Sequence, residues 1–414
     1  MFQAILRDYS SLAVIVAVMT ASAIKTCKHT ERMIMDPVLS DDLVSIQEAA
    51  MRFARERVAP GYMQRETVAS VDRSLVREMG ELGLIAPELD EKFGGLGLPS
   101  LTSGLIIEAI GHADLNVAYV QLLGSLNGKI IAQHASPDLA REWLPKLTAG
   151  EILLSLGLTE PRGGSDAANL ALSARKDGNR YILKGEKSSI SMADQSDAII
   201  LFARTGPQEA RARGVSAFLV PMDSPGITTQ RYKDLGSHAV GRCSIFFDDV
   251  EVPEANRLAG EGAGFIQVMQ GFDFSRALIG LQVLGAARAS LDEAWIYVQE
   301  REAFGTPIAR NQGVTFPLAE GDTMISAARQ LCYHTLRLKD AGQPHTAEAA
   351  MCKWLAPKTA VDVIHQCLLT HGHYGWSLDL PHQQRLRDVM GLEIGDGTAQ
   401  IMKMIVSRER LGNR

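Results

Sequence analysis

The residues best placed for chemistry lie near the end of the 414-residue chain, in the turn Gly395-Asp396-Gly397-Thr398. Two glycines, which can adopt positive φ, flank a single carboxylate. Apolar residues then recur at three- and four-residue intervals from Ile401, and Gly412 follows them, which predicts a helix after the turn. A carboxylate held at the start of such a helix could take a proton from a bound substrate. An ordinary Asp-Gly turn is the alternative reading of the tetrapeptide alone.

The whole segment Arg387 to Leu411, RDVMGLEIGDGTAQIMKMIVSRERL, resembles the C-terminal signature of the FAD-dependent acyl-CoA dehydrogenase family. In that family the dipeptide before Gly-Thr is usually Tyr-Glu, and the Glu is the catalytic base. Here Gly395-Asp396 stands in that place, so the base is shorter by one methylene and the Tyr is absent. The resemblance implies that Asp396 is the catalytic base and that Thr398 and Gln400 contribute to the cofactor site.

A second polar element is the run LTEPRGGSD from Leu158 to Asp166, followed by GEKSSIS ending at Ser191. Its Gly, Thr and Ser residues offer backbone N–H groups and hydroxyls, as the carbonyls and pyrophosphate of a flavin require. A polar loop without a ligand is the alternative. The run is similar to the flavin-binding signature of the same family. This implies that Leu158 and Thr159 contact the isoalloxazine ring and that Ser191 bonds the flavin.

The same resemblance places Ser165 near both the cofactor and the acyl-CoA. Two positions depart from the family: Ser189 stands where a Trp usually packs against the flavin ring, and Leu156 where a Tyr or Phe is common. Both departures open space beside the flavin.

A third element, Arg301-Glu302-Ala303-Phe304-Gly305 with Gln312, is similar to the family's R-x-x-FG…Q motif, by which one subunit reaches the FAD of its neighbour. A guanidinium can pair with pyrophosphate oxygens, and a Phe offers an aromatic face. The alternative is that Arg301 ends a helix and Phe304 packs in the core. The stretch around Gly372 resembles, more weakly, the run that holds the adenylate half of a neighbouring FAD.

The substrate side is expected at GFDFSRA, where Asp273 and Arg276 match family positions at the start of a helix above the substrate. A structural ion pair between them is the alternative. Ser275 lies where some members place their base, but a Ser cannot take that proton at neutral pH. Glu91 matches a cavity-lining position, and its neighbour Asp90 could be a second acid; solvated loop carboxylates are the alternative for both.

These residues require elements to position them. Helical spacing of apolar residues predicts an α-helical domain over residues 36–155, short β-rich runs predict a small antiparallel β-domain over 156–262, and helical periodicity returns over 263–414. The fold class expected is mainly α with a small β-domain, acyl-CoA dehydrogenase-like, its C-terminal domain a four-helix bundle. Residues 1–34 are expected to be a non-native or disordered extension, although Leu12–Ile24 could pass for part of a signal peptide.

Composition narrows the functional classes. The chain is 46% hydrophobic and 22% charged, as in globular proteins, and its net charge of −6 gives no basic footprint for nucleic acid. Five scattered cysteines, without a close pair, argue against disulfides and metal sites and for a reducing compartment. We therefore expect a cytoplasmic enzyme with no metal, nucleic-acid or membrane partner.

The resemblance implies that Asp396 removes the α proton of an acyl-CoA while the β hydrogen passes to FAD as hydride. An Asp base with Gly395 and Ser189 nearby resembles the alicyclic branch, so the expected reaction is cyclohexanecarboxyl-CoA to cyclohex-1-ene-1-carboxyl-CoA. Straight-chain or branched acyl-CoA oxidation, a nitroalkane oxidase, and a flavin-binding protein with little dehydrogenase activity are the alternatives. Electron-transfer flavoprotein as acceptor and a homotetramer are expected through the family alone.

Overall fold

The computed structural model describes residues 39–412, so the expected extension at residues 1–34 lies outside the described part. The chain divides into two units, Met1–Ser45 and Ile46–Arg414. The first unit contributes, in its described part, the start of helix α2 (Asp41–Phe53). All features discussed below belong to the second unit.

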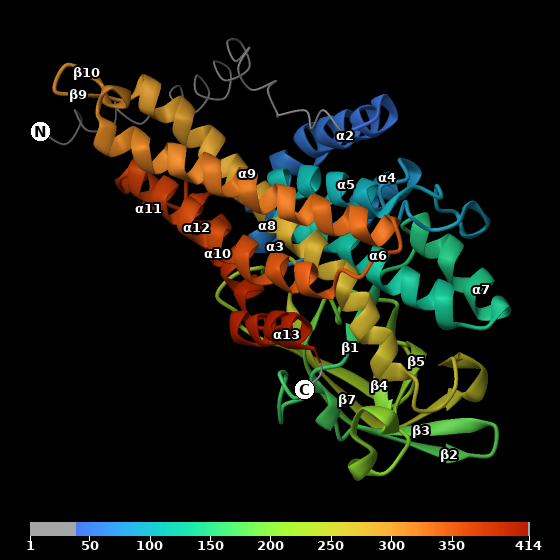
Figure 1. The fold of residues 1–414 in the computed structure, drawn as a ribbon. Helices are drawn as coiled ribbons and strands as arrows, with labels where there is room; N and C mark the ends of the chain where they lie inside the picture. The colour runs from blue at the N-terminus through green and yellow to red at the C-terminus, as the bar shows by residue number, and fades with distance from the viewer. Residues whose placement is uncertain (1–38, 413–414) are drawn as a thin grey trace, which may run out of the picture. The chain divides into compact units, whose positions relative to one another are not determined.

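The N-terminal part of this unit is helical. After a π-helical turn (Ala54–Val58) and a 3₁₀ turn (Ala59–Gly61), the helices are α3 (Tyr62–Val68), α4 (Arg73–Glu81), α5 (Ser100–Ala113), α6 (Leu115–His134) and α7 (Pro137–Thr148). Helices α5 and α6 are buried on almost every face, because their sequences carry few charges and many small or apolar residues. They therefore form the centre of the helical layer, beside α8 (Figure 1).

The middle part is one sheet with strand order β6-β7-β3-β2-β4-β5-β8, and β1 pairs with β4. The strands are β1 (Leu154–Gly157), β2 (Ser173–Asp177), β3 (Arg180–Ser191), β4 (Ala198–Arg204), β5 (Val215–Pro221), β6 (Ile227–Arg231), β7 (Arg242–Pro253) and β8 (Arg257–Leu258). Pairing is antiparallel as predicted, except that β1 and β2 run parallel to β4. Every residue of β4 is buried, which explains its continuous apolar sequence.

The C-terminal part contains the long helices α8 (Gly264–Glu300), α9 (Gln312–Asp340) and α10 (Thr346–His371), which lie side by side (Figure 1). Short helices α11 (His373–Trp376), α12 (His382–Met390) and α13 (Ala399–Leu411) follow, and α13 packs on α10. Strands β9 (Glu302–Ala303) and β10 (Thr306–Pro307) form a small hairpin between α8 and α9. The order of helices, sheet and helices confirms the predicted fold class.

Two further findings concern the whole described part. None of the helices within residues 39–412 is long and apolar enough to cross a membrane. Cys243, Cys332, Cys352 and Cys367 are buried free thiols, while Cys27 lies outside the described residues.

Candidate active site

Asp396 lies in the turn that the sequence predicted, two residues before Thr398, the N-cap residue of α13. Thr398 caps that helix, and its Oγ1 accepts a hydrogen bond from the Ile401 N–H at 3.4 Å. The sequence suggested that the two glycines adopt positive φ, but only one of them does. Gly397 has φ 113°, Asp396 itself has φ 55°, and Gly395 lies outside the left-handed region. Asp is among the few non-glycine residues that adopt this conformation readily, and strained backbone concentrates at functional sites.

The Asp396 carboxyl group is half-buried, and three cations act on it. Burial raises the pKa of Asp396, whereas the charges of Lys353, Arg276 and Arg242 lower it, and the net effect is an increase. The three cations come from α10, α8 and β7. A carboxylate whose pKa is raised by burial and opposed by three nearby cations is suited to general-base chemistry.

Lys353 ties the Asp396 loop to α10. Its side chain is fully buried, and Nζ donates hydrogen bonds to the Leu392 carbonyl at 2.6 Å and the Gly397 carbonyl at 3.2 Å. Burial lowers the pKa of Lys353 to about 8, opposed chiefly by the charge of Asp396. The sequence analysis missed this residue, although a lone Lys in the apolar run AAMCKWLA was a signal for it.

Arg276 is buried and forms the ion pair with Asp273 that was the alternative reading, with Nη1 and Oδ1 3.0 Å apart. The charge of Asp396 also acts on the pKa of Arg276. The ion pair is therefore confirmed, and the role on the substrate side stays a prediction. Asp273 is held in turn by the Thr346 hydroxyl at 2.6 Å. The Arg276 Nε and the Ser275 Oγ are buried without a hydrogen-bond partner among the described residues.

Arg242 and Tyr119 complete the group, and the sequence analysis missed both. Arg242 donates to the Tyr119 hydroxyl at 3.3 Å and to Asp234 Oδ2 at 3.4 Å. Burial raises the pKa of the Tyr119 phenol, and the charge of Asp396 adds to this increase. Arg242 is also the cross-strand partner of Ser191. Arg242 therefore connects the Asp396 turn with strand β3, whose Ser191 is expected to bond a flavin.

The polar loop after β1 lies against the middle of β3. Lys187 Nζ donates to the Leu158 carbonyl at 3.0 Å, and the Ser188 N–H donates to the Thr159 carbonyl at 2.9 Å. At this point β3 has an extra residue relative to β7, and Ser189 has φ 57°. This β-bulge turns Ser189 outward, where it is exposed.

A buried ion pair supports the same loop. Lys187 Nζ lies 2.8 Å from Glu160 Oε1, and the Glu160 carboxylate also accepts the N–H groups of Ala171 and Leu172. Burial lowers the pKa of Lys187 to about 8, against the opposing charge of Glu160. Ser165, in contrast, is exposed further along the loop.

The hydroxyls of Thr159, Ser189 and Ser191 fit a flavin as hydrogen-bond partners. None of the three has a hydrogen-bond partner among the described residues, and all three are at least partly open to solvent. The Thr159 carbonyl bonds the bulge that contains Ser189, and Ser191 ends the same strand opposite Arg242, so the three residues lie along one segment of β3 and the loop against it. Free hydroxyls held on a rigid strand match the carbonyls and nitrogens of a flavin ring.

The remaining predicted cofactor residues lie elsewhere. Arg301 and Phe304 follow the C-terminal end of α8, and Gln312 begins α9. Gly372 ends α10 nearby, since His371 stacks on Tyr297 of α8 at 4.3 Å between ring centroids. Phe304 is fully exposed at the hairpin turn, at 105% of its reference area, so the alternative that it packs in the core is wrong.

Three predicted residues have exposed positions. Glu91 and Asp90 lie in an exposed 3₁₀ turn, where Asp90 accepts the Lys92 N–H. Gln400 is exposed in the first turn of α13. No contact among residues 39–412 joins Glu91 to the group around Asp396, so its substrate role stays a prediction.

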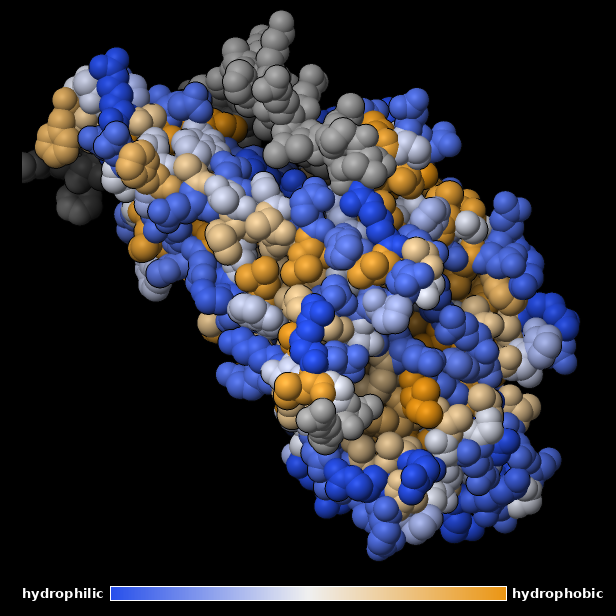
Figure 2. Space-filling model, in the orientation of Figure 1, coloured by the Kyte–Doolittle hydropathy of each residue, from blue (hydrophilic) through white to orange (hydrophobic). Residues whose placement is uncertain are grey.

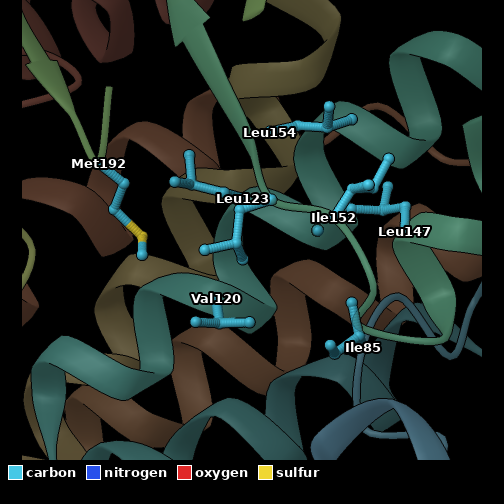
Figure 3. Close-up of a pocket in the computed structure, with 9 residues that line it drawn as sticks. Ile85, Val120, Leu123, Leu147, Ile152, Leu154 and Met192 are labelled. Carbon is cyan, nitrogen blue, oxygen red and sulfur yellow. The ribbon is translucent and has the colours of Figure 1, made fainter. Parts of the chain in front are cut away.

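A small apolar pocket lies between α6 and the start of the sheet (Figure 3). Its lining includes Val120 and Leu123 of α6, Leu154 of β1 and Met192. It has no polar side chain and no room for a water molecule, so it is a packing defect and not a substrate site. No group of His, Cys, Asp or Glu within the described part could hold a metal ion.

Comparisons with known proteins agree along the chain. Family models match for the acyl-CoA dehydrogenase N-terminal domain at residues 40–151, the middle domain at 155–250 and the C-terminal domain at 262–411. An acyl-CoA dehydrogenase of Bacillus subtilis is 34% identical over 376 residues, covering 90% of this chain and 99% of the relative.

Two solved structures are similar throughout. Butyryl-CoA dehydrogenase from Megasphaera elsdenii has a TM-score of 0.88 at 31% identity, covering 91% of this chain and 100% of that one. A glutaryl-CoA dehydrogenase from Mycobacterium smegmatis in complex with FADH2 has a TM-score of 0.86 at 26% identity, covering 92% and 97%.

Proposed function

The chain belongs to the acyl-CoA dehydrogenase family, and from that premise we propose that it oxidises cyclohexanecarboxyl-CoA to cyclohex-1-ene-1-carboxyl-CoA with Asp396 as the base. As a member of this family, the protein is an FAD-dependent oxidoreductase that dehydrogenates an acyl-CoA. The observation that carries the proposal is the environment of Asp396, a half-buried carboxylate with a raised pKa and three cations around it.

In the proposed reaction the substrate loses a proton from its α carbon and a hydride from its β carbon, which leaves a carbon–carbon double bond. Bound FAD supplies the two-electron acceptor. Asp396 takes the α proton, and Arg276 and Lys353 stabilise the ionised form of that base before the reaction. Lys353 also fixes the loop, through the Leu392 and Gly397 carbonyls, so that the carboxylate is held in place.

Space beside the base supports a ring substrate. A Cβ placed on Gly395 would come no closer than 3.6 Å to another heavy atom, the Gly391 carbonyl oxygen, so this side of Asp396 is open. Ser189 is small and exposed where a bulky ring neighbour is usual. An Asp reaches less far than a Glu, which leaves room for a substituent on the α carbon.

The test is an anaerobic titration of the purified FAD-loaded enzyme with cyclohexanecarboxyl-CoA, followed by flavin absorbance. We expect bleaching in the wild type and at least a hundredfold slower bleaching in Asp396→Asn, the usual range for loss of a general base. Glu393→Gln is the matched control, since Glu393 is an exposed carboxylate in the same loop.

Three outcomes would redirect the proposal. Faster bleaching by butyryl-CoA than by the ring substrate would reject the ring and leave the family chemistry in place. Bleaching by a nitroalkane, with peroxide formed in air, would assign the oxidase alternative. If neither acyl-CoA nor the nitroalkane reduces the flavin, the protein is a flavin-binding protein with little dehydrogenase activity. Electron-transfer flavoprotein is the proposed acceptor, to be tested by its reduction under the same conditions.

A further inference from the structure

A second cavity, of about 300 Å³, lies where the C-terminal half of α6, the first turns of α8 and the end of α9 meet. Gln267, Gln270 and Phe274 line it from α8. Gln267 and Phe274 are seven residues apart and so share one face of α8. With 3.6 residues per turn, Arg276 lies about 200° around the helix from Phe274. The cavity is therefore on the other side of α8 from the group around Asp396.

Two lysines converge on this cavity. Lys129 of α6 and Lys339 of α9 both line it, and their Nζ atoms lie 5.5 Å and 4.7 Å from the centroid of the same Phe274 ring. Burial, followed by the charge of Lys129, lowers the pKa of Lys339 to about 8. Two like charges held this close are unfavourable unless an anion offsets them.

The protein's own carboxylates offset these two positive charges only in part, although Glu88 Oε1 is buried without a hydrogen-bond partner among the described residues. The negative groups that act on Lys339 are Asp340 and Glu88. The Asp340 carboxylate accepts the first N–H groups of α5, and the Glu88 carboxylate accepts two serine hydroxyls. Neither Lys129 nor Lys339 makes an ion pair or donates a hydrogen bond to an acceptor within residues 39–412.

The other groups at the cavity also suit an oxyanion. His345 lines it and directly precedes α10, whose first turn has no side-chain cap, so the dipole of this 26-residue helix favours negative charge there. Glu348, the acidic residue of that turn, pairs with Arg410. Gln267 presents a buried Oε1 without a partner among the described residues, an acceptor for a protonated oxyanion oxygen.

We propose that this cavity binds a phosphate group, either as inorganic phosphate or as the phosphate of an organic monoester. A phosphate carries close to two negative charges at neutral pH, which matches the two ammonium groups, and its oxygens can accept hydrogen bonds from Lys129 and Lys339. The one O–H that inorganic hydrogen phosphate keeps can also donate to Gln267 Oε1. The site is separate from the proposed dehydrogenation site and does not depend on which acyl-CoA is oxidised.

Isothermal titration of the FAD-loaded enzyme with inorganic phosphate, at constant ionic strength, tests the proposal. One phosphate should bind per chain, and Lys129→Met or Lys339→Met should each weaken binding at least tenfold. Lys403→Met is the matched control, because Lys403 also lies over an aromatic ring, at 4.7 Å from Trp354, but has no second lysine beside it. Its affinity should equal that of the wild type.

Proton uptake gives a second readout. Near pH 8 the bound anion should raise the pKa of Lys339, so that binding takes up a proton. The measured heat of binding should then depend on the ionisation enthalpy of the buffer. His345, Lys129, Asp340 and Glu88 are the other titratable groups that face Lys339. In Lys339→Arg, binding should persist with reduced uptake, because Arg stays protonated. This variant keeps the positive charge and serves if Lys339→Met does not fold.

The proposal is overturned if millimolar phosphate gives no heat, or if phosphate affinity is equal in the wild type and both Met variants. A flavin absorbance change that survives both Lys→Met substitutions would place the phosphate at the flavin and would also reject the cavity. The two phosphate sources are separated with AMP. At least tenfold tighter binding of AMP assigns an organic monoester, and equal binding assigns free phosphate.

Discussion

Asp396 is surrounded by the charges of Lys353, Arg276 and Arg242, which oppose the effect of burial on its pKa. Replacing Lys353 by Met removes the largest of these opposing charges, so the pKa of Asp396 should rise further. Since the base must be ionised to accept a proton, the acid limb of kcat/KM should move to higher pH. A pH profile of acyl-CoA-dependent flavin reduction measures the shift.

Lys358→Met is the control for this prediction, because Lys358 lies on the same helix but is exposed and pairs with Asp362. Its acid limb should match the wild type. If Lys353→Met has an unmoved acid limb while remaining folded, then Asp396 is not the group whose ionisation limits the reaction. Some loss of stability is expected as well, since the buried Leu392 carbonyl and the part-buried Gly397 carbonyl lose their donor, at about 1–3 kcal/mol for the buried one.

Gly395 should determine the choice between ring and straight-chain substrates. Its backbone lies outside the left-handed region and its side is open, so Gly395→Tyr should be tolerated by the fold. We expect kcat/KM for cyclohexanecarboxyl-CoA to fall at least tenfold, with a smaller change for butyryl-CoA, because a phenol would fill the space proposed for the ring. Equal losses for both substrates would show that Gly395 does not act on specificity.

The sequence predicted local features of the site better than its long-range ones. Asp396, its turn and the helix after Thr398 could be predicted, because their pattern is continuous in the chain. Lys353, Arg242 and Tyr119 could not, since each reaches the site from a different element far away in the sequence. A lone polar residue in an apolar run signals a buried polar contact but does not name its partner.

At the level of elements, Asp388 of α12 joins the helical parts to the sheet. Its carboxylate accepts hydrogen bonds from the Tyr62 hydroxyl of α3, the Asn116 amide of α6 and the Ser237 N–H after β6. It is completely buried, and burial raises its pKa to about 6. Because only a 3₁₀ turn (Gly391–Glu393) separates α12 from the Asp396 turn, these contacts also position the segment that carries the proposed base.

The raised pKa of Asp388 makes stability depend on pH. The folded state binds this proton more tightly than the unfolded state, so the contribution is fully present below the unfolded pKa and is lost as pH rises through about 6. The loss corresponds to about 3 kcal/mol at most. In urea unfolding between about pH 4 and 7, the wild type should lose stability relative to Asp388→Asn.

Asp379→Asn is the reference for that series, because Asp379 is exposed in a loop and bonds only Ser377 among the described residues. Its pH dependence should run parallel to that of the wild type. If Asp388→Asn also runs parallel to the wild type, the Asp388 proton is not retained in the folded state, and its three donors keep the carboxylate ionised.

Three large apolar side chains are strongly exposed around the hairpin and α11. Phe304, Trp376 and Leu378 are exposed at 105%, 74% and 73% of their reference areas, around the hairpin and α11. Figure 2 shows some hydrophobic side chains at the hairpin end, among others scattered over the same face. Exposed clusters of this kind mark contacts with another chain.

The homotetramer remains a proposal, and Phe304 offers the direct test of it. If Phe304 reaches the FAD of a neighbouring subunit, Phe304→Ser should weaken FAD binding at least tenfold and make the mass measured by light scattering fall on dilution, with the fold of each chain unchanged. Leu82→Ser is the control, since Leu82 is also exposed, at 57%, but lies after α4, away from the hairpin in the sequence.

FAD affinity that falls with no change of mass would place the Phe304 effect within one chain. If neither the mass nor the FAD affinity changes, the segment Arg301 to Gly305 is not part of the cofactor site. Phe304, an exposed aromatic side chain at a turn with positive φ, would then contact neither a partner chain nor the flavin.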